Sequence, residues 1–504
     1  MAGLGELAER SLERLGDHRA LVFEERWYTS AEMHERACRL AGGLRAAGVR
    51  PDDRVVVCMA NSPDVLVTYA ALWRCGAVPT PVIPAVTPVE LQHVLLDAGA
   101  RTMIGSAASA ALVREAAYGT GAQVVLAGGQ PLQAGERELE ELVTDVGPLV
   151  PRADDDMAAL LYTGGTTGRA KGVVLEHGGL ARISAARAQV IGRSGANDLL
   201  LALPLSHVYG LLNAVTRPQM AEPGFVCLQA RFDAARWLDL AERHRPGSGA
   251  LVPSMLQLLL REDLEAADLS ALRHVTSGGA PLSPAVRAQF ERRVPTARVC
   301  DGYGCTELTS TATMNPYDAP REGSVGRPLP GVALRVVDDA DEPVPVGVDG
   351  EVTVRSPGVM RGYWRSPQAT AEVVRGGWLH TGDVGHLDDD GYLYVVDRLK
   401  DLIIRGGFNV YPRDVEDALL AHPAVSAAAV VGRPDELYGE EVVAYVTLAP
   451  AAEPVPTAEL LEWCGQRLAR HKRPRELHLV ESVPLTSVGK TDRKVLRRQA
   501  AGES

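Results

Sequence analysis

The chain has 504 residues, a formal net charge of -12, and 46% hydrophobic and 23% charged residues. This length allows about three domains, or one large domain with a smaller one, and enough apolar residues for a sizeable core. The composition argues against long disorder, and the acidic balance argues against a mainly nucleic-acid-binding surface, which usually carries a basic face.

In the first part of the chain, short β runs alternate with helical patterns. Apolar residues recur at helical spacing in Ala31–Ala47, and Arg54–Ala60 is an apolar run typical of a buried strand. Further helices are predicted at Asp64–Cys75, Pro88–Ala98, Asp233–Arg243 and Pro284–Arg293. Further strands are predicted at Arg101–Gly105, Gln123–Ala127, Leu199–Leu203, Phe225–Gln229, Gly249–Val252, Arg273–Thr276 and Arg298–Cys300. Such alternation predicts parallel sheets covered by helices.

The pattern changes after about residue 320. Strands are predicted at Ala333–Asp338, Gly350–Arg355, Gly391–Val396, Leu402–Arg405, Val425–Val431 and Val442–Leu448, and helices at Asp414–Ala421 and Thr457–Arg470. We therefore predict an α/β protein with an N-terminal domain of helix-covered sheets at residues 1–397. Its part from about 320 to 397 is a β-rich subdomain, and residues 398–504 form a small α+β C-terminal domain.

The seven cysteines are scattered, without a CxxC pair, which is typical of free thiols in a reducing cytosol. The first twenty residues lack the hydrophobic core of a signal peptide. No uncharged apolar run reaches the length of about 18 residues that spans a bilayer. We expect a cytoplasmic monomer or homodimer without a membrane span or a nucleic-acid partner.

The clearest local feature is the segment Tyr162–Gly172, which reads YTGGTTGRAKG between two apolar runs. Its glycines let the backbone approach a ligand closely, its threonines add hydroxyl donors, and Lys171 adds a positive charge. Together these groups suit a polyphosphate. The GxxxxGK[ST] spacing of a P-loop is absent. A polar hairpin turn without a ligand is the structural alternative.

This loop resembles the phosphate-binding signature of the adenylate-forming superfamily, which includes acyl-CoA synthetases, peptide-synthetase adenylation domains and luciferases. The chain departs from that signature at Gly164, where Ser is usual, and at Ala170, where Pro is usual. Further similar segments follow in the family's order: Pro204–Gly210, Ser277–Leu282, Gly302–Glu307, Trp378–Gly385, Asp397–Pro412 and Pro484–Arg493. The resemblance extends from about Tyr28 to Leu496, and the conserved order of segments makes it specific.

The resemblance implies binding roles for these segments. The ATP phosphates are expected at Thr163, Gly164, Gly165, Thr166, Thr167 and Lys171. The adenine is expected at Gly279, Ala280, Gly302, Tyr303 and Gly304, stacked on the Tyr303 ring. Thr306 is expected to hold the α-phosphate and Glu307 to ligate Mg²⁺, while Asp383 and Arg398 bind the ribose.

The resemblance also implies a division of labour in catalysis. His207 is expected to contact or gate the acyl pocket, and Lys490 to act at the forming acyl–phosphate bond. The C-terminal domain is expected to be mobile and to rotate about Lys400 between two half-reactions. After that rotation, a pantetheine arm would pass beside Gly406 and Gly407. Cys305, inside the Gly302–Glu307 segment, is interpreted as a spacer and not a nucleophile.

The implied activity is that of an AMP-forming acyl-CoA synthetase, similar to medium- and long-chain or aryl carboxylate–CoA ligases. It would use ATP, Mg²⁺ and coenzyme A to make an acyl-AMP and then a thioester. The alternative is a stand-alone adenylation enzyme that loads an acid onto the phosphopantetheine of a carrier protein. A luciferase-like oxygenase and a nucleotide-binding protein without catalysis are further alternatives.

The acid is predicted from the segments that resemble the family's acyl pocket, which include His207–Leu211, Ser254–Gln257 and Gly278–Ala280. These stretches are mostly apolar or small, which favours an uncharged aliphatic or aryl tail. They contain no Asp to hold an α-amino group, which disfavours a standard amino acid. Asn213 and Gln257 are the candidates for contact with a polar substituent.

Overall fold

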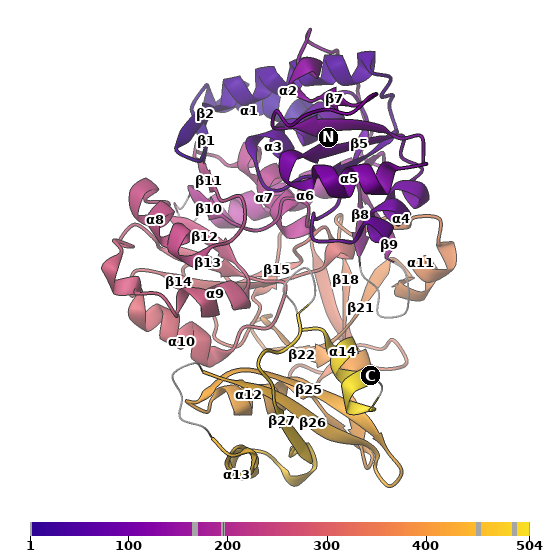
Figure 1. The fold of residues 1–504 in the computed structure, drawn as a ribbon. Coiled ribbons are helices and arrows are strands. Elements are labelled where there is room, and N and C mark those ends of the chain that lie inside the picture. Colours follow the sequence, from indigo (N-terminus) through magenta and orange to yellow (C-terminus); the bar gives the residue numbers. More distant parts are fainter. Residues whose placement is uncertain are drawn as a thin grey trace.

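Two sheets with mostly parallel strands form the N-terminal part of the computed structural model, which describes residues 3–163, 170–192, 195, 197–449, 455–485 and 491–502 (Figure 1). The larger has the order β16-β15-β14-β13-β12-β10-β11-β1-β2 and the smaller the order β4-β3-β5-β6-β7. The larger sheet contains β1 (Arg19–Phe23), β2 (Arg26–Thr29), β10 (Leu199–Leu201), β11 (Val226–Leu228), β12 (Ser248–Leu251), β13 (His274–Ser277), β14 (Arg298–Tyr303), β15 (Thr313–Met314) and β16 (Arg327–Pro328). The smaller contains β3 (Arg54–Cys58), β4 (Val78–Pro81), β5 (Thr102–Ser106), β6 (Gln123–Ala127) and β7 (Arg137–Glu138). The predicted α/β class is confirmed.

Helices pack against these sheets, as the strand–helix alternation predicts. They are α1 (Leu7–Leu15), α2 (Ser30–Ala46), α3 (Pro63–Arg74), α4 (Pro88–Ala98), α5 (Ala110–Ala117), α6 (His177–Gly192), α7 (Val208–Thr216), α8 (Ala234–His244), α9 (Pro253–Leu259) and α10 (Pro284–Arg293). In the larger sheet, β10 to β14 are parallel, so their carboxyl ends lie at one edge, with Ser277 paired to Asp301. Ligands of such sheets bind outside the carboxyl ends of the strands.

Antiparallel strands form two smaller layers beside this edge. One is the sheet β19-β9-β8, built from β8 (Met157–Thr163), β9 (Lys171–Glu176) and β19 (Gly362–Tyr363). The other is β17-β18-β21-β20 with β22 on β21, built from β17 (Ala333–Val337), β18 (Gly350–Arg355), β20 (Val374–Arg375), β21 (Trp378–Leu387) and β22 (Leu393–Arg398). The short helix α11 (Pro367–Val373) connects β19 to β20. The second sheet corresponds to the β-rich region that the sequence predicts.

The C-terminal part has a sheet of its own, in the order β24-β23-β26-β25 with β27 on β26. It contains β23 (Ile403–Arg405), β24 (Phe408–Val410), β25 (Val425–Asp435), β26 (Gly439–Leu448) and β27 (Glu476–Leu479), with the helices α12 (Pro412–Leu420), α13 (Thr457–Arg467) and α14 (Arg493–Ala500). Its buried apolar clusters draw only on residues from Ile403 onward. In Figure 1 these elements lie at the opposite end of the molecule from α1 and α2. The domain limits at residues 397 and 398 stay a prediction.

Local chemistry explains why helix α4 has the predicted bounds. In α4, Thr87 Oγ1 accepts from the Glu90 amide, the Glu90 carboxylate accepts from the Thr87 amide, and Pro88 occupies the first turn. This capping box and N-terminal proline start the helix, and Gly99 ends it in the left-handed conformation, with a φ of 62°.

One predicted helix is shorter than the sequence pattern indicates. The prediction runs from Thr457 to Arg470, but α13 ends at Arg467 because Leu468 is extended, with a φ of -113°, and packs against the C-terminal core. Among the helices that the structure describes, none is long and apolar enough to cross a membrane.

Candidate active site

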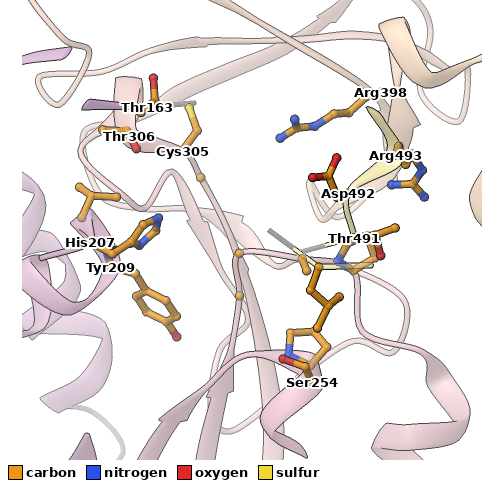
Figure 2. Close-up of a pocket in the computed structure, with 18 of the residues that line it drawn as sticks. Thr163, His207, Tyr209, Ser254, Cys305, Thr306, Arg398, Thr491, Asp492 and Arg493 are labelled. Atoms are coloured by element: carbon orange, nitrogen blue, oxygen red, sulfur yellow. Dashed lines mark hydrogen bonds between the residues drawn. The ribbon is translucent and has the colours of Figure 1, made fainter. Parts of the chain in front are cut away.

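A cavity of about 2320 Å³ lies where the carboxyl edge of the parallel sheet, the β8–β9 hairpin, β21 and the C-terminal part meet. The predicted site residues that line it are Thr163, Lys171, His207, Gly279, Ala280, Gly302, Tyr303, Gly304, Thr306, Glu307, Asp383 and Arg398. Figure 2 shows Thr163, Thr306 and His207 on one side of this space and Arg398, Asp492 and Arg493 on the other. The fold thus brings together segments that lie far apart in the sequence.

The predicted phosphate loop connects two antiparallel strands. Thr163 at the end of β8 pairs with Lys171 at the start of β9, so the loop closes a hairpin. Lys171 Nζ lies 5.0 Å from the centre of the Tyr363 ring, a cation–π geometry. Gly164, Gly165, Thr166 and Thr167 lie outside the described residues.

Glu307 follows β14 in a short 3₁₀ helix, Thr306–Leu308, and contacts the same tyrosine. The Tyr363 hydroxyl donates to Glu307 Oε1 at 2.9 Å. Burial and the neighbouring Glu307 carboxylate raise the pKa of Tyr363, so its hydroxyl remains a donor. Tyr363 therefore links the carboxylate of Glu307 to the ammonium of Lys171, and the sequence patterns gave no signal for it.

A second group of contacts joins the end of β14 to β21 and β22. The Tyr303 hydroxyl donates to Asp383 Oδ2 at 2.6 Å, and Arg398 Nε donates to Asp383 Oδ1 at 3.1 Å. Asp383 is buried, whereas the Arg398 side chain is 47% exposed. Burial and the Asp383 carboxylate raise the pKa of Tyr303. An acceptor, a donor and an aromatic ring therefore meet at one point of the cavity wall.

Glycine is required near the end of β14 because the backbone is closely packed there. A Cβ at Gly304 would lie 2.0 Å from the carbonyl oxygen of Ser310. A Cβ at Gly278 would lie 3.3 Å from the carbonyl oxygen of Gly302 and 3.6 Å from the Tyr209 ring. Small residues therefore keep this part of the wall open for a flat group.

His207 is the N-cap of α7. Its Nδ1 accepts from the backbone N–H of Tyr209 at 3.2 Å. An accepting Nδ1 places the proton of the neutral imidazole on Nε2, so that nitrogen is a donor. Figure 2 shows the ring pointing into the central space, on the same side as Tyr209 and Thr306.

Cys305 also lines the cavity, between Gly304 and Thr306. Burial and the Glu307 carboxylate raise the pKa of its thiol well above the usual range. A protonated thiol is a weak nucleophile, which agrees with the interpretation of Cys305 as a spacer.

The C-terminal part contributes Thr491, Asp492 and Arg493 to the cavity, together with Lys400. Lys490 precedes Thr491 directly but lies outside the described residues. Lys400 is in a 3₁₀ turn, Leu399–Asp401, between β22 and β23, and burial and Arg398 lower its pKa. Gly407 lies in the β23–β24 turn with a φ of 83° and does not line this cavity.

Arg187 on α6 is a second lining residue that the sequence analysis missed. A signal for it exists, because Arg187 lies four residues after Ile183 and three after Ser184, on the face of α6 that is buried. An arginine at an apolar helical position indicates a buried cation.

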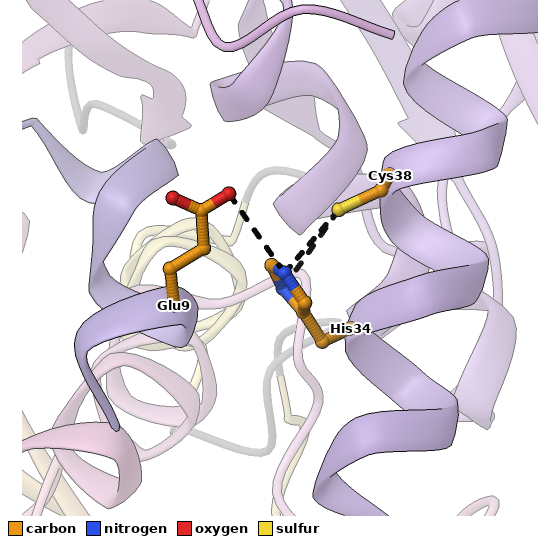
Figure 3. Close-up of side chains that lie close together, drawn as sticks. All are labelled: Glu9, His34 and Cys38. Atoms are coloured by element: carbon orange, nitrogen blue, oxygen red, sulfur yellow. Dashed lines mark hydrogen bonds and ion pairs between the residues drawn. The ribbon is translucent and has the colours of Figure 1, made fainter. Parts of the chain in front are cut away.

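Three side chains of the types that can ligate a metal ion, Glu9, His34 and Cys38, lie together outside the cavity, where α1 meets α2 (Figure 3). His34 Nε2 is 3.4 Å from Cys38 Sγ and 3.9 Å from Glu9 Oε1. Arg74 Nη1 donates to the same Glu9 oxygen at 2.5 Å. Because an arginine already neutralises the carboxylate, we assign these residues to packing and not to a metal centre.

Comparison with known proteins gives two family matches. The family described as AMP-binding enzyme matches residues 8–364, and the AMP-binding enzyme C-terminal domain matches residues 414–490. The feruloyl-CoA synthase of an Amycolatopsis species is 38% identical over 474 residues, which cover 94% of this chain and 94% of that protein.

Solved structures resemble the whole chain as well. The anthranilate CoA ligase AuaEII, solved with anthranoyl-AMP, gives a TM-score of 0.91 at 26% identity and covers 99% of this chain and 97% of its own. The amide bond synthetase McbA from Marinactinospora thermotolerans gives a TM-score of 0.88 at 31% identity, and the match covers 99% of this chain and 100% of McbA.

Proposed function

The chain belongs to the AMP-binding enzyme family, and from this premise we propose that it activates a carboxylic acid with ATP and transfers the acyl group to the thiol of coenzyme A. The observation that carries the proposal is one cavity that both parts of the chain line. It is lined by Lys171, Glu307, Asp383 and Arg398 from the N-terminal part and by residues 491–493 from the C-terminal part.

In the first half-reaction, a carboxylate oxygen of the acid attacks the α-phosphorus of ATP. The bond from that phosphorus to the bridging oxygen breaks, and pyrophosphate leaves with the electron pair. Two anions must meet, so positive charge and hydrogen-bond donors stabilise the transition state. We assign Lys171 and Lys490 as the positive charges that stabilise the transition state, and Thr306 as the residue that holds the α-phosphate. Asp383 and Arg398 would hold the ribose, with the adenine beside the Tyr303 ring.

Glu307 suits a divalent cation by its chemistry. It is a half-buried carboxylate whose Oε1 is already fixed by the Tyr363 hydroxyl, while Mg²⁺ prefers oxygen ligands and keeps several waters. We propose that Glu307 holds Mg²⁺ bound to ATP, which when present neutralises phosphate charge. The role of this chain's own residues is to fix that carboxylate.

In the second half-reaction, the thiol sulfur bonds to the acyl carbon and its proton passes to solvent. The bond from that carbon to the phosphate oxygen breaks, and AMP leaves with the electron pair. His207 is positioned at the start of α7 with Nε2 as a donor, and we assign it to the acyl group. We propose that the C-terminal domain turns about Lys400 between the two steps, which exchanges Lys490 for the Gly407 turn. Such a motion would limit turnover.

Three kinds of compound are candidates for the acceptor of the acyl group. The 38% identity to a feruloyl-CoA synthase over nearly the whole chain favours coenzyme A. Loading of a carrier-protein phosphopantetheine remains the alternative from the sequence, and the likeness to an amide bond synthetase adds an amine. Product formation with coenzyme A, holo-carrier proteins and amines, measured on one preformed acyl-adenylate, distinguishes them. Turnover with an amine or a carrier protein but not with coenzyme A would refute our choice.

Carboxylate-dependent exchange of pyrophosphate into ATP tests the first half-reaction directly. We expect Lys490→Ala to suppress this exchange far more than acyl transfer from preformed acyl-adenylate. Lys472→Ala is the matched control. Lys472 is also a C-terminal lysine, but its Nζ donates to Asp414 Oδ2 at 2.6 Å, and neither residue lines the cavity. Equal losses in both half-reactions would contradict the assigned role of Lys490.

A further inference from the structure

Arg187 is a buried cation on the wall of the acyl side of the cavity. Its residue exposure is 2%, and it lines the same space as His207. Two other arginines are buried in the described part of the chain, and each has a carboxylate partner: Arg74 pairs with Glu9, and Arg287 pairs with Asp301. For Arg187, no carboxylate oxygen of the described residues lies within 4.0 Å.

The partners that Arg187 does have are neutral. Its Nη2 donates to Asn213 Oδ1 at 3.3 Å and its Nη1 to Thr216 Oγ1 at 3.5 Å, while its Nε has no acceptor among the described atoms. Asn213 Nδ2 in turn donates to the Tyr209 carbonyl, and the Thr216 hydroxyl donates to the Leu212 carbonyl. The acceptor atoms of α7 are thereby aimed at Arg187. They fix the guanidinium without neutralising it.

The surroundings of Arg187 add positive charge, and the nearby carboxylate of Asp198 acts on Arg217 and not on Arg187. Arg217 lies near, and burial together with Arg187 lowers its pKa to about 10. The nearby Tyr209 and Tyr317 hydroxyls are neutral, because burial raises the pKa of both. A guanidinium stays protonated in proteins, and a buried charge without a partner is costly. The Arg187 guanidinium is therefore a buried positive charge that no carboxylate of the described residues contacts.

We propose that the acid substrate carries a second carboxylate, which pairs with Arg187 while the reacting carboxylate lies near His207. This inference rests on the proposed function and names its substrate class, a dicarboxylic acid, in place of the uncharged tail that the sequence predicts. Asn213, which contacts Arg187, follows His207 by six residues along α7. At 1.5 Å per residue, the backbones of these two residues are about 9 Å apart along the helix axis, so acids with one aromatic ring or a short methylene chain between their carboxylates are the ones to test.

The test compares matched acids by pyrophosphate exchange. Succinate, adipate, isophthalate and terephthalate are each paired with their monomethyl ester, which keeps the reacting carboxylate and removes the second charge. For the favoured pair, we expect wild-type kcat/KM to be at least about tenfold higher for the diacid, since loss of one partner from a buried pair is strongly unfavourable. Arg187→Met should lower the diacid value by at least about tenfold and leave the ester value unchanged, which brings the ratio to about one. Arg187→Lys should retain part of the preference.

Controls separate selectivity from folding. Arg74→Met removes another buried arginine, one that has its own carboxylate partner and does not line the cavity, so it should leave the diacid-to-ester ratio unchanged. If Arg187→Met lowers kcat/KM equally for the diacid and its ester and also lowers the thermal midpoint, Arg187 has a structural role and the proposal is overturned. Exchange with monoacids alone would leave the proposed function standing and overturn this inference. If no carboxylate supports exchange, the proposed function fails and the inference falls with it.

Discussion

Replacing Tyr363 by phenylalanine removes one hydroxyl and keeps the aromatic ring. The hydroxyl donates to Glu307 Oε1 at 2.9 Å and so fixes the carboxylate that we assign to Mg²⁺. A hydrogen bond to a charged group contributes about 1.5–3 kcal/mol when buried. Both side chains are half-buried, so we expect a loss of about 1 kcal/mol, or roughly fivefold weaker binding of ATP with Mg²⁺. Tyr363→Leu also removes the ring beside Lys171, which adds about 0.5–1 kcal/mol.

Isothermal titration calorimetry with ATP at several Mg²⁺ concentrations measures this effect without depending on turnover. Tyr438→Phe is the control, because Tyr438 is 45% exposed and does not line the cavity. In a Glu307→Gln background, the cost of Tyr363→Phe should fall by at least half, as a double-mutant cycle requires for coupled residues. An unchanged affinity, or the same loss in both backgrounds, would refute the proposed positioning of Glu307 by Tyr363.

Two further predictions concern backbone packing and pH. Gly304→Ala places a Cβ 2.0 Å from the Ser310 carbonyl oxygen, so the backbone must shift close to Thr306 and Glu307. We expect a loss of about 1–3 kcal/mol in unfolding free energy and of nucleotide binding. Gly192→Ala, which meets nothing within 4 Å, should be neutral or slightly stabilising. His177 is buried with Nδ1 accepting from Leu4, and burial lowers its pKa from 6.5 to about 4. Between these two pKa values, His177 is therefore protonated in the unfolded chain and neutral in the folded chain. Stability should fall between pH 6.5 and pH 4, by about 3 kcal/mol in total. Urea unfolding should show this slope in wild type and its loss in His177→Gln; a slope that persists would show that another group is responsible.

Patterns confined to short segments were sufficient for much of the fold. Helix α4 has the predicted bounds because its cap, its first proline and its terminal glycine all lie within the helix and its two flanking residues. The buried strand β6 is also found at the predicted Gln123–Ala127. Likewise, the glycines, threonines and lysine that predict a phosphate site between Thr163 and Lys171 lie close together in the sequence. Periodicity and turn chemistry are local properties, so one chain carries them without its neighbours.

What the sequence determined by itself is the α/β class, the order of the segments and the set of polar groups that suit a nucleotide. Only the tertiary structure decided which of these groups meet. Asp383 and Arg398 are paired in register across β21 and β22, while Tyr303 reaches Asp383 from β14, which belongs to a different sheet. Tyr363 reaches Glu307 because β19 pairs with β9. The burial of Arg187 without a carboxylate partner likewise depends on how α6 packs against α7. Long-range packing sets these contacts, and no local pattern encodes them.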